Sequence, residues 1–267
     1  MANLVLTRPI GQSMRLAELL LEQVPGAHLI HLPLLSIIPN ESQADTHRLQ
    51  ILVDAADLAI FVSPNAIECG MRLLQKSWPK SVPIAVVGGG SAEALGRRGI
   101  TADHGYQIFF PKNPENWDSE GLWRELNQGQ VIWQGKNILF LRGSGGREWL
   151  SEQFLSQGAR TTQFETYRRI PLSKEATAWQ ALKQVDANQS ACLLTSSEAV
   201  HYLAEYLKQQ DQLDWGEDWL NFAKIICSHP KIAQTAKNEG FKKVELCSPG
   251  DDNLVLASQN WFNSLTS

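Results

Sequence analysis

The 267-residue sequence lacks several features that mark common functional classes. It has no basic excess, because 24 Lys and Arg residues stand against 28 Asp and Glu residues, and the net charge is -4. Proteins that bind nucleic acid usually carry such an excess to neutralise phosphates. Long apolar runs are also missing, since prolines and a glycine interrupt the longest uncharged stretch, residues 24–40. We therefore expect neither nucleic-acid binding nor a membrane span.

Cysteine is scarce and unpatterned. The 4 cysteines show no CxxC spacing and the 6 histidines are scattered, so the sequence predicts no metal site. We expect buried, reduced thiols, the usual state of free cysteine in cytosolic proteins. The first residues, MANLVLTRP, lack the basic segment and the apolar core of a signal peptide. These features favour a cytoplasmic protein.

The nucleotide and hydrolase motifs are absent or incomplete. Residues 142–146 read RGSGG after an apolar run, but Glu148 occupies the place of the third small residue of a GxGxxG fingerprint. There is no GxxxxGK[ST] loop, and no GxSxG elbow that would indicate a serine hydrolase. The sequence therefore predicts no nicotinamide, flavin or nucleoside triphosphate site.

Short apolar strands alternate with amphipathic helices along the whole sequence. Residues 59–62, 84–87, 138–141 and 191–194 read as strands, each followed by a turn and a helix. This alternation is typical of parallel sheets covered by helices on both faces, the α/β class. With 43% apolar residues, the chain can bury two ordinary domain cores.

An internal repeat indicates a duplicated domain. AIFVSPNAI aligns with CLLTSSEAV, and at the same offset LLSIIP aligns with the end of ETYRRIP. A proline follows each of the two extended segments that fall at equivalent places in the repeat. We therefore expect two similar domains joined by a two-stranded connector: a discontinuous domain of residues 1–36 and 172–267, an inserted domain of residues 40–167, and connectors 37–39 and 168–171.

The turns that follow the predicted strands are candidate binding elements. In open parallel sheets, ligands bind at the carboxyl ends of strands, where helix N-termini present unpaired N–H groups. Hydroxyl residues and glycines there would let an anionic ligand approach the backbone, although such residues are also ordinary helix caps. The turns begin at Arg8, Ser63, Gly88, Arg142, Thr195 and Ser228, and Ser91, Gly143 and Ser196 lie within them.

Several of these residues are predicted to begin helices. Ser63 precedes a proline, the arrangement favoured at a helix start, and Ser91 is expected to cap the helix that ends at Gly99. Ser119 should cap the helix that runs to residue 126. Residues 195–198, TSSE, have the spacing of a capping box that begins at Thr195.

Tyr167 is singled out by its position. It lies in an extended segment at a predicted domain crossing, and two arginines follow it. Its phenol could face the binding site. The alternative is an interfacial tyrosine with a buried ring and a hydroxyl exposed to water.

These motifs together resemble the bacterial uroporphyrinogen-III synthase family. The resemblance rests on LVLTRP, FVSPNAIE, AVVGGGSAEALGRRGI, FLRGSGGREWL, ETYRRIP, LLTSSEAVHYL and ICSHPKIA, in this order. It implies two α/β domains with a two-stranded connector and a cyclising lyase without cofactor. The implied reaction converts hydroxymethylbilane to uroporphyrinogen III and water, with inversion of ring D, in heme, siroheme and cobalamin synthesis.

The resemblance also implies roles for individual residues. Tyr167 matches the tyrosine suspected of assisting loss of the hydroxyl. Lys231 departs from the pattern, because family members can have a small hydroxyl residue there, and it either pairs with a substrate carboxylate or is a solvated helix residue. The implied substrate-binding set is Arg8, Ser63, Asn65, Gly88, Ser91, Arg142, Gly143, Thr195, Ser196, Ser228 and Lys231.

The resemblance further implies a monomer that makes transient contact with the preceding enzyme of the pathway. The alternative function is a two-domain, non-catalytic protein that binds a small anionic ligand, because a fold alone does not establish catalysis.

Overall fold

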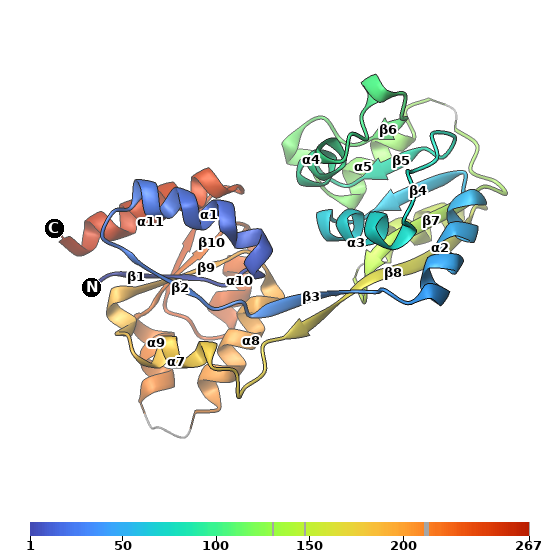
Figure 1. Ribbon diagram of the computed structural model, residues 1–267. Coiled ribbons are helices and arrows are strands. Elements are labelled where there is room, and N and C mark those ends of the chain that lie inside the picture. Colours follow the sequence, from blue (N-terminus) through green and yellow to red (C-terminus); the bar gives the residue numbers. More distant parts are fainter. Residues whose placement is uncertain (130, 147, 211–213, 267) are drawn as a thin grey trace. The chain divides into compact units, whose positions relative to one another are not determined.

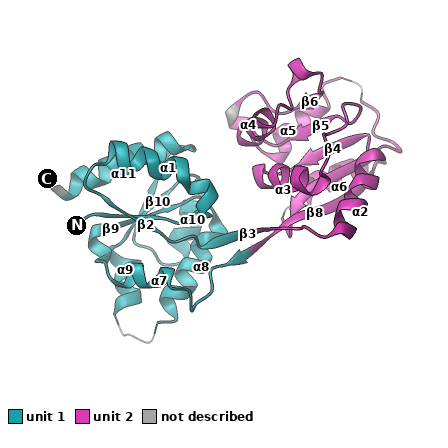
Figure 2. Cartoon of the chain, viewed as in Figure 1, with its two compact units in different colours: residues 1–36, 170–267 teal, residues 37–169 magenta. Residues whose placement is uncertain are grey.

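The computed structural model describes residues 1–129, 131–146, 148–210 and 214–266. The chain divides into two compact units, shown in teal and magenta in Figure 2. Unit 1 comprises residues 1–36 and 170–267, and unit 2 comprises residues 37–169. Unit 2 is thus inserted in the chain of unit 1, and both termini belong to unit 1 (Figure 1).

Unit 1 contains a parallel sheet in the order β11-β10-β9-β1-β2. Its side chains alternate between two cores, as expected for a sheet buried on both faces. Leu4 and Leu6 pack with α1 and α11, whereas Val5 packs with α8 and α10. The strands are β1 (Asn3–Leu6), β2 (His28–His31), β9 (Ser190–Leu194), β10 (Lys224–Cys227) and β11 (Lys243–Leu246). The helices are α1 (Ile10–Gln23), α7 (Ala178–Lys183), η3 (Ala187–Gln189), α8 (Ser197–Lys208), α9 (Trp215–Phe222), α10 (Pro230–Asn238) and α11 (Asp251–Thr266).

Unit 2 contains a sheet in the order β3-β8-β7-β4-β5-β6. Ala59 and Phe61 pack under α2, α3 and α4, whereas Leu58 and Ile60 pack with α5 and α6. The strands are β3 (Leu35–Pro39), β4 (Leu58–Phe61), β5 (Ile84–Val86), β6 (Ile108–Phe109), β7 (Asn137–Gly143) and β8 (Arg160–Pro171). The helices are α2 (Gln43–Asp54), α3 (Pro64–Leu74), α4 (Gly89–Arg97), η1 (Ala102–His104), η2 (Pro114–Asn116), α5 (Ser119–Leu126) and α6 (Trp149–Ser156).

The strands β3 and β8 carry the chain between the units. They are neighbours in the sheet, and they run in opposite directions because Asn40 N–H donates to the Thr166 carbonyl while Leu172 N–H donates to the Leu34 carbonyl. The other neighbouring strands of both sheets are paired in parallel. The predicted fold class, two α/β domains with parallel sheets flanked by helices, is confirmed.

The residues that begin the helices differ in part from the predictions. Ser63 caps α3 as expected, because its hydroxyl accepts a hydrogen bond from Ala66 N–H. The prediction for Ser91 is wrong: Gly88 is the N-cap of α4, and Ser91 lies buried in its first turn. Asp118 rather than Ser119 caps α5.

In unit 1 the helix starts are displaced by one residue. Ser196 rather than Thr195 caps α8, since its hydroxyl accepts from Ala199 N–H. His229 rather than Ser228 is the N-cap of α10, and its Nδ1 accepts from Lys231 N–H. Each displacement occurs where two residues capable of capping follow one another in the sequence.

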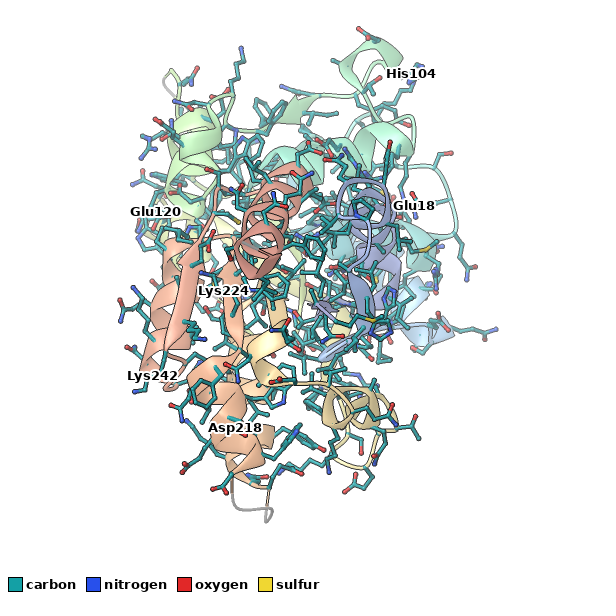
Figure 3. The ribbon with its side chains drawn as sticks, turned by 90° about the vertical axis from the view of Figure 1, so that its left-hand side faces the viewer. Glu18, His104, Glu120, Asp218, Lys224 and Lys242 are labelled. Carbon is teal, nitrogen blue, oxygen red and sulfur yellow. The ribbon has the colours of Figure 1, made fainter. Side chains whose placement is uncertain are left out.

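The four cysteines are free thiols, and three of them are buried. Burial raises the pKa of Cys192 and of Cys227 to about 12, which keeps both protonated. The charged side chains of Glu18, Asp218 and Lys242, labelled in Figure 3, are exposed. In the described part of the chain, no helix is long and apolar enough to cross a membrane.

Candidate functional site

A cavity of about 210 Å³ lies at the carboxyl end of the sheet in unit 2. Its lining comes from the turns after β4, β5 and β7, from the starts of α5 and α6 and from the C-terminal half of β8. The cavity therefore lies where open parallel sheets generally bind ligands. The lining residues are Val62, Ser63, Val87, Ser119, Phe140, Arg142, Gly143, Gly145, Gly146, Leu150, Ser151, Tyr167 and Arg169.

Tyr167 is wholly buried in the wall of this cavity, with 0% of its surface exposed. Its hydroxyl lies 3.1 Å from Ser63 Oγ, and Arg169 Nη2 donates to it at 3.2 Å. The expected alternative, a hydroxyl exposed to water, is therefore wrong. The phenol belongs to a hydrogen-bonded group of three side chains.

The ring of Tyr167 occupies space that Gly143 leaves open. A Cβ atom at Gly143 would lie 2.5 Å from Cζ of Tyr167, closer than real contacts allow. The two residues are partners across β7 and β8, at the point where a bulge between Arg142 and Gly143 shifts the register. Gly143 thus serves to admit the tyrosine.

Arg142 organises the glycine-rich turn after β7. Its side chain is 7% exposed, and the guanidinium donates to Glu148 Oε1 at 2.7 Å, to Gln163 Oε1 at 2.8 Å and to the Gly145 carbonyl at 2.5 Å. Gln163 also donates to the second oxygen of Glu148. Arg142, which the sequence predicted to bind a ligand, therefore bonds within the protein instead and fixes the shape of the turn.

The pKa of Glu148 reflects this network. Burial alone would raise it, but the hydrogen bonds donated by Gln163 and Arg142 outweigh burial and lower the pKa below its ordinary value of 4.5. The carboxylate is thus charged at neutral pH. It balances the buried guanidinium of Arg142.

The remaining predicted residues of unit 2 are less available than expected. Gly88 and Gly89 lie against the ring of Trp117, and a Cβ at Gly89 would come within 2.3 Å of that ring. Ser91 is 4% exposed. Asn65 lies in the first turn of α3, next to the cavity residue Ser63.

At the carboxyl end of the sheet in unit 1, three of the predicted turns follow neighbouring strands: those at Arg8, Thr195 and Ser228. Arg8 Nη1 forms a 2.6 Å ion pair with Asp251, and Arg8 Nε donates to Thr195 Oγ1 at 3.1 Å. Ser228, at the end of β10, is buried, and Lys231 is exposed in the first turn of α10. The hydroxyl of Ser196 accepts a hydrogen bond from Ala199 N–H and so caps α8.

A second cavity, of about 270 Å³, lies in unit 1 between the end of β8, α7 and α8. Its walls include Trp179 and Tyr206, whose rings stack at 3.5 Å, and the ion pair of Lys174 with Glu205. It is larger than the cavity beside Tyr167. However, it contains none of the strand-end residues that the sequence singled out, so the site is assigned to unit 2.

Sequence reasoning missed three residues that bond with the predicted site residues: Arg169, Gln163 and Asp251. Arg169 was noted only as a neighbour of Tyr167, but alternation along β8 carries both side chains to the same face. Asp251 follows a glycine at a helix start, an ordinary position for an acidic residue. Among the described residues, no group of three or more His, Cys, Asp and Glu residues could hold a metal ion.

The chain resembles known proteins along most of its length. The family described as Uroporphyrinogen-III synthase HemD matches residues 15–255. Uroporphyrinogen-III synthase of Escherichia coli (strain K12) is 25% identical over 261 residues, which cover 95% of this chain and 98% of the relative. The enzyme of Proteus mirabilis is 28% identical over 171 residues, 63% of this chain and 80% of the relative.

Two solved structures share the fold. A mutant uroporphyrinogen III synthase from the extremely thermophilic bacterium Thermus thermophilus has a TM-score of 0.63 at 15% identity, over 100% of this chain and 99% of the other. Uroporphyrinogen-III synthetase from Helicobacter pylori has a TM-score of 0.61 at 15% identity, over 98% of this chain and 100% of the other.

Proposed function

The chain belongs to the uroporphyrinogen-III synthase family of cyclising lyases in tetrapyrrole biosynthesis, and we propose how its own residues act on hydroxymethylbilane. The assignment of this activity rests on the family match over residues 15–255. The cavity beside Tyr167 supports a site for the chemical step, because hydroxyl and guanidinium groups converge there. The comparisons offer no support for a non-catalytic anion-binding protein.

The reaction closes a linear tetrapyrrole after its terminal hydroxyl leaves as water. Pyrrole electrons expel the hydroxyl as water once it is protonated, giving an azafulvene cation. The substituted carbon of ring D then attacks to form a spiro intermediate, which reopens and recloses with the ring turned. The protein has to supply conformation, exclusion of water and one proton.

We assign proton supply to the group that contains Tyr167. A phenol hydroxyl can donate its proton to a leaving hydroxyl. Arg169 donates to the phenol oxygen and would stabilise negative charge that develops there as the proton leaves. This hydrogen bond supports the assignment of Tyr167 to the proton-donating group.

Substrate binding is assigned to the strand-end turns of both units. Hydroxymethylbilane carries eight carboxylates, as its acetate and propionate arms require, and helix N-termini favour anions. Lys231 is exposed in the first turn of α10 and offers a cation. Arg8 and Arg142 act indirectly, by fixing their turns through Asp251 and Glu148. We further propose a cytoplasmic monomer that needs no cofactor and contacts the preceding enzyme transiently.

The test is to mix the protein with enzymatically generated hydroxymethylbilane and to separate the uroporphyrinogen isomers. Spontaneous closure gives isomer I, so isomer III requires catalysis. We expect isomer III as the main product, with and without a chelator. Isomer I alone would contradict the proposed function.

A further inference from the structure

Tyr167 cannot reach a substrate directly in this structure. Its side chain has no exposed surface, whereas Ser63 is partly exposed and Arg169 is exposed. All three line the same cavity, and the phenol oxygen lies behind Ser63 Oγ at 3.1 Å. A proton that starts on the phenol therefore has to pass through another group before it reaches the cavity.

The hydrogen bonds define a direction for that proton. A guanidinium only donates, so the phenol oxygen accepts from Arg169 Nη2. Ser63 Oγ accepts from Ala66 N–H at 3.1 Å as the cap of α3. If Tyr167 donates to Ser63, both bonds are satisfied and the hydrogen of Ser63 can point into the cavity. The reverse arrangement leaves the phenol hydrogen without an acceptor among the described residues.

We propose that Ser63 is the catalytic residue that protonates the departing hydroxyl, and that Tyr167 and Arg169 are positioning residues that supply and direct its proton. This inference rests on the proposed function and names a residue that touches the reacting atoms. Ser63 gives its proton to the hydroxyl as it takes the proton of Tyr167, so its oxygen never carries a full charge. The resulting phenolate lies beside the guanidinium of Arg169.

The step balances in protons and electrons. The C–O bond breaks and its electron pair leaves with the oxygen as water, while the pyrrole supplies the electrons that form the azafulvene as a cation, which keeps its N–H proton. When the ring recloses, the carbon that forms the new bond loses its hydrogen as a proton. That proton restores the phenol through Ser63, so no oxidant or further reactant is needed.

The experiment is a double-mutant cycle on turnover. Ser63→Gly removes the hydroxyl but keeps a residue that serves well as a helix cap, and Tyr167→Phe removes only the phenol oxygen. We expect each to lower kcat for isomer III by roughly tenfold to a thousandfold, with a smaller change in KM. The double variant should be no more than about twofold slower than the slower single variant, because both act in one relay.

Two further variants, together with two control variants, separate the relay from a structural role. Ser63→Thr restores a hydroxyl and should recover most of the turnover that Ser63→Gly loses. Arg169→Gln should lower kcat. Arg168→Gln, at the exposed neighbouring residue, should leave kcat unchanged. Ser42→Gly is the matched control, because Ser42 caps α2 in the same unit through Asp45 N–H. It should leave kcat unchanged.

The outcomes are distinct. A double variant whose loss equals the product of the two single losses shows independent roles and overturns the relay. Parental kcat in folded Ser63→Gly also overturns it, and Ser63→Ala repeats the cycle if the glycine variant does not fold. Failure of the parent protein to form isomer III contradicts the proposed function instead.

Discussion

At the scale of single residues, the site depends on one close contact between Gly143 and Tyr167. Only glycine leaves room for the phenol ring between β7 and β8. The ring is held on its other side by the bonds of its hydroxyl to Ser63 and Arg169. The position of the phenol oxygen is therefore set by packing as well as by hydrogen bonds.

We predict that Gly143→Ala lowers turnover by about a hundredfold, because a displacement near 1 Å can cost that much. Its Cβ would lie 2.5 Å from Cζ of Tyr167, so the ring has to move. Overpacking should also lower the free energy of unfolding by about 1–3 kcal/mol. Steady-state kinetics and urea unfolding measure the two effects.

The control is Gly96→Ala, inside α4, where a Cβ meets nothing within 4 Å. It should raise the free energy of unfolding by about 0.5–1 kcal/mol, through the helix propensity of alanine, and leave turnover unchanged. Parental turnover in Gly143→Ala would show that the exact place of the phenol is unimportant.

The sequence indicated Tyr167 but not its surroundings. Its burial results from the pairing of β7 with β8, and the bulge at Gly143 that aligns the two residues has no local signal in the sequence. The partner Ser63 lies 104 residues away along the chain. Contacts of this kind depend on tertiary structure, so neither motif spacing nor periodicity predicts them.

At the scale of secondary-structure elements, the Arg142 network joins three of them. The guanidinium at the end of β7 bonds with Glu148 just before α6 and with Gln163 on β8. A buried arginine needs such partners, because an unpaired charge in the interior is costly. The network therefore makes the local stability of the site depend on the charge of Glu148.

We predict a pH dependence from the lowered pKa of Glu148. Its stabilising contribution is complete above pH 4.5, the ordinary value, and is lost as the pH falls through the lower pKa of the folded state. The Tm of Glu148→Gln should thus lie below that of the parent at pH 7. The difference in Tm between Glu148→Gln and the parent should be smaller at pH 3 than at pH 7.

Thermal melts at several pH values measure this difference. Glu152→Gln, at an exposed position in the first turn of α6, is the control and should show no such narrowing. A constant difference between the parent and Glu148→Gln from pH 7 to pH 3 would show that the charge of Glu148 is not what stabilises the network.

The helix starts show what local sequence could predict. Every strand followed by a capping residue did lead into a helix, but the capping residue itself was misassigned at Ser91, Ser119 and Thr195. At Ser119 and Thr195 a neighbouring residue has similar capping ability, and local propensity does not choose between the two. The choice follows from where the preceding strand ends in the sheet.

At the scale of the whole molecule, the internal repeat predicted two similar α/β folds, and each unit has its own pair of cores. The repeat was informative because strand order and helix placement follow from alternation and from the handedness of parallel crossovers. The sequence did not predict that β3 and β8 run in opposite directions, because two extended segments with prolines do not specify how they pair.

We predict that the two units open separately in hydrogen exchange. Leu203→Ala removes a fully buried side chain of α8 and should destabilise unit 1 by about 2–5 kcal/mol. Mass spectrometry should then detect faster exchange in β1, β9 and β10, with β4 and β7 nearly unchanged. Only two chain segments join the units, which limits the coupling between them.

The reciprocal variant is Leu74→Ala, at a fully buried position of α3 in unit 2. It should accelerate exchange in β4 and β7 and spare β1 and β9. Equal acceleration in both units by either variant would mean that the chain unfolds as one cooperative body.

The insertion of unit 2 between β2 and β9 also determines the order in which the protein can fold during synthesis. The segment that forms unit 2, residues 37–169, is continuous and leaves the ribosome complete, whereas β1 has to wait for β9. Residues 7–189 separate these two strands, which corresponds to roughly 10–40 s at ordinary rates of translation. During that time one edge of β1 has no partner, and unpaired edges favour aggregation. During synthesis, unit 1 rather than unit 2 is therefore the part of the chain that would need a chaperone.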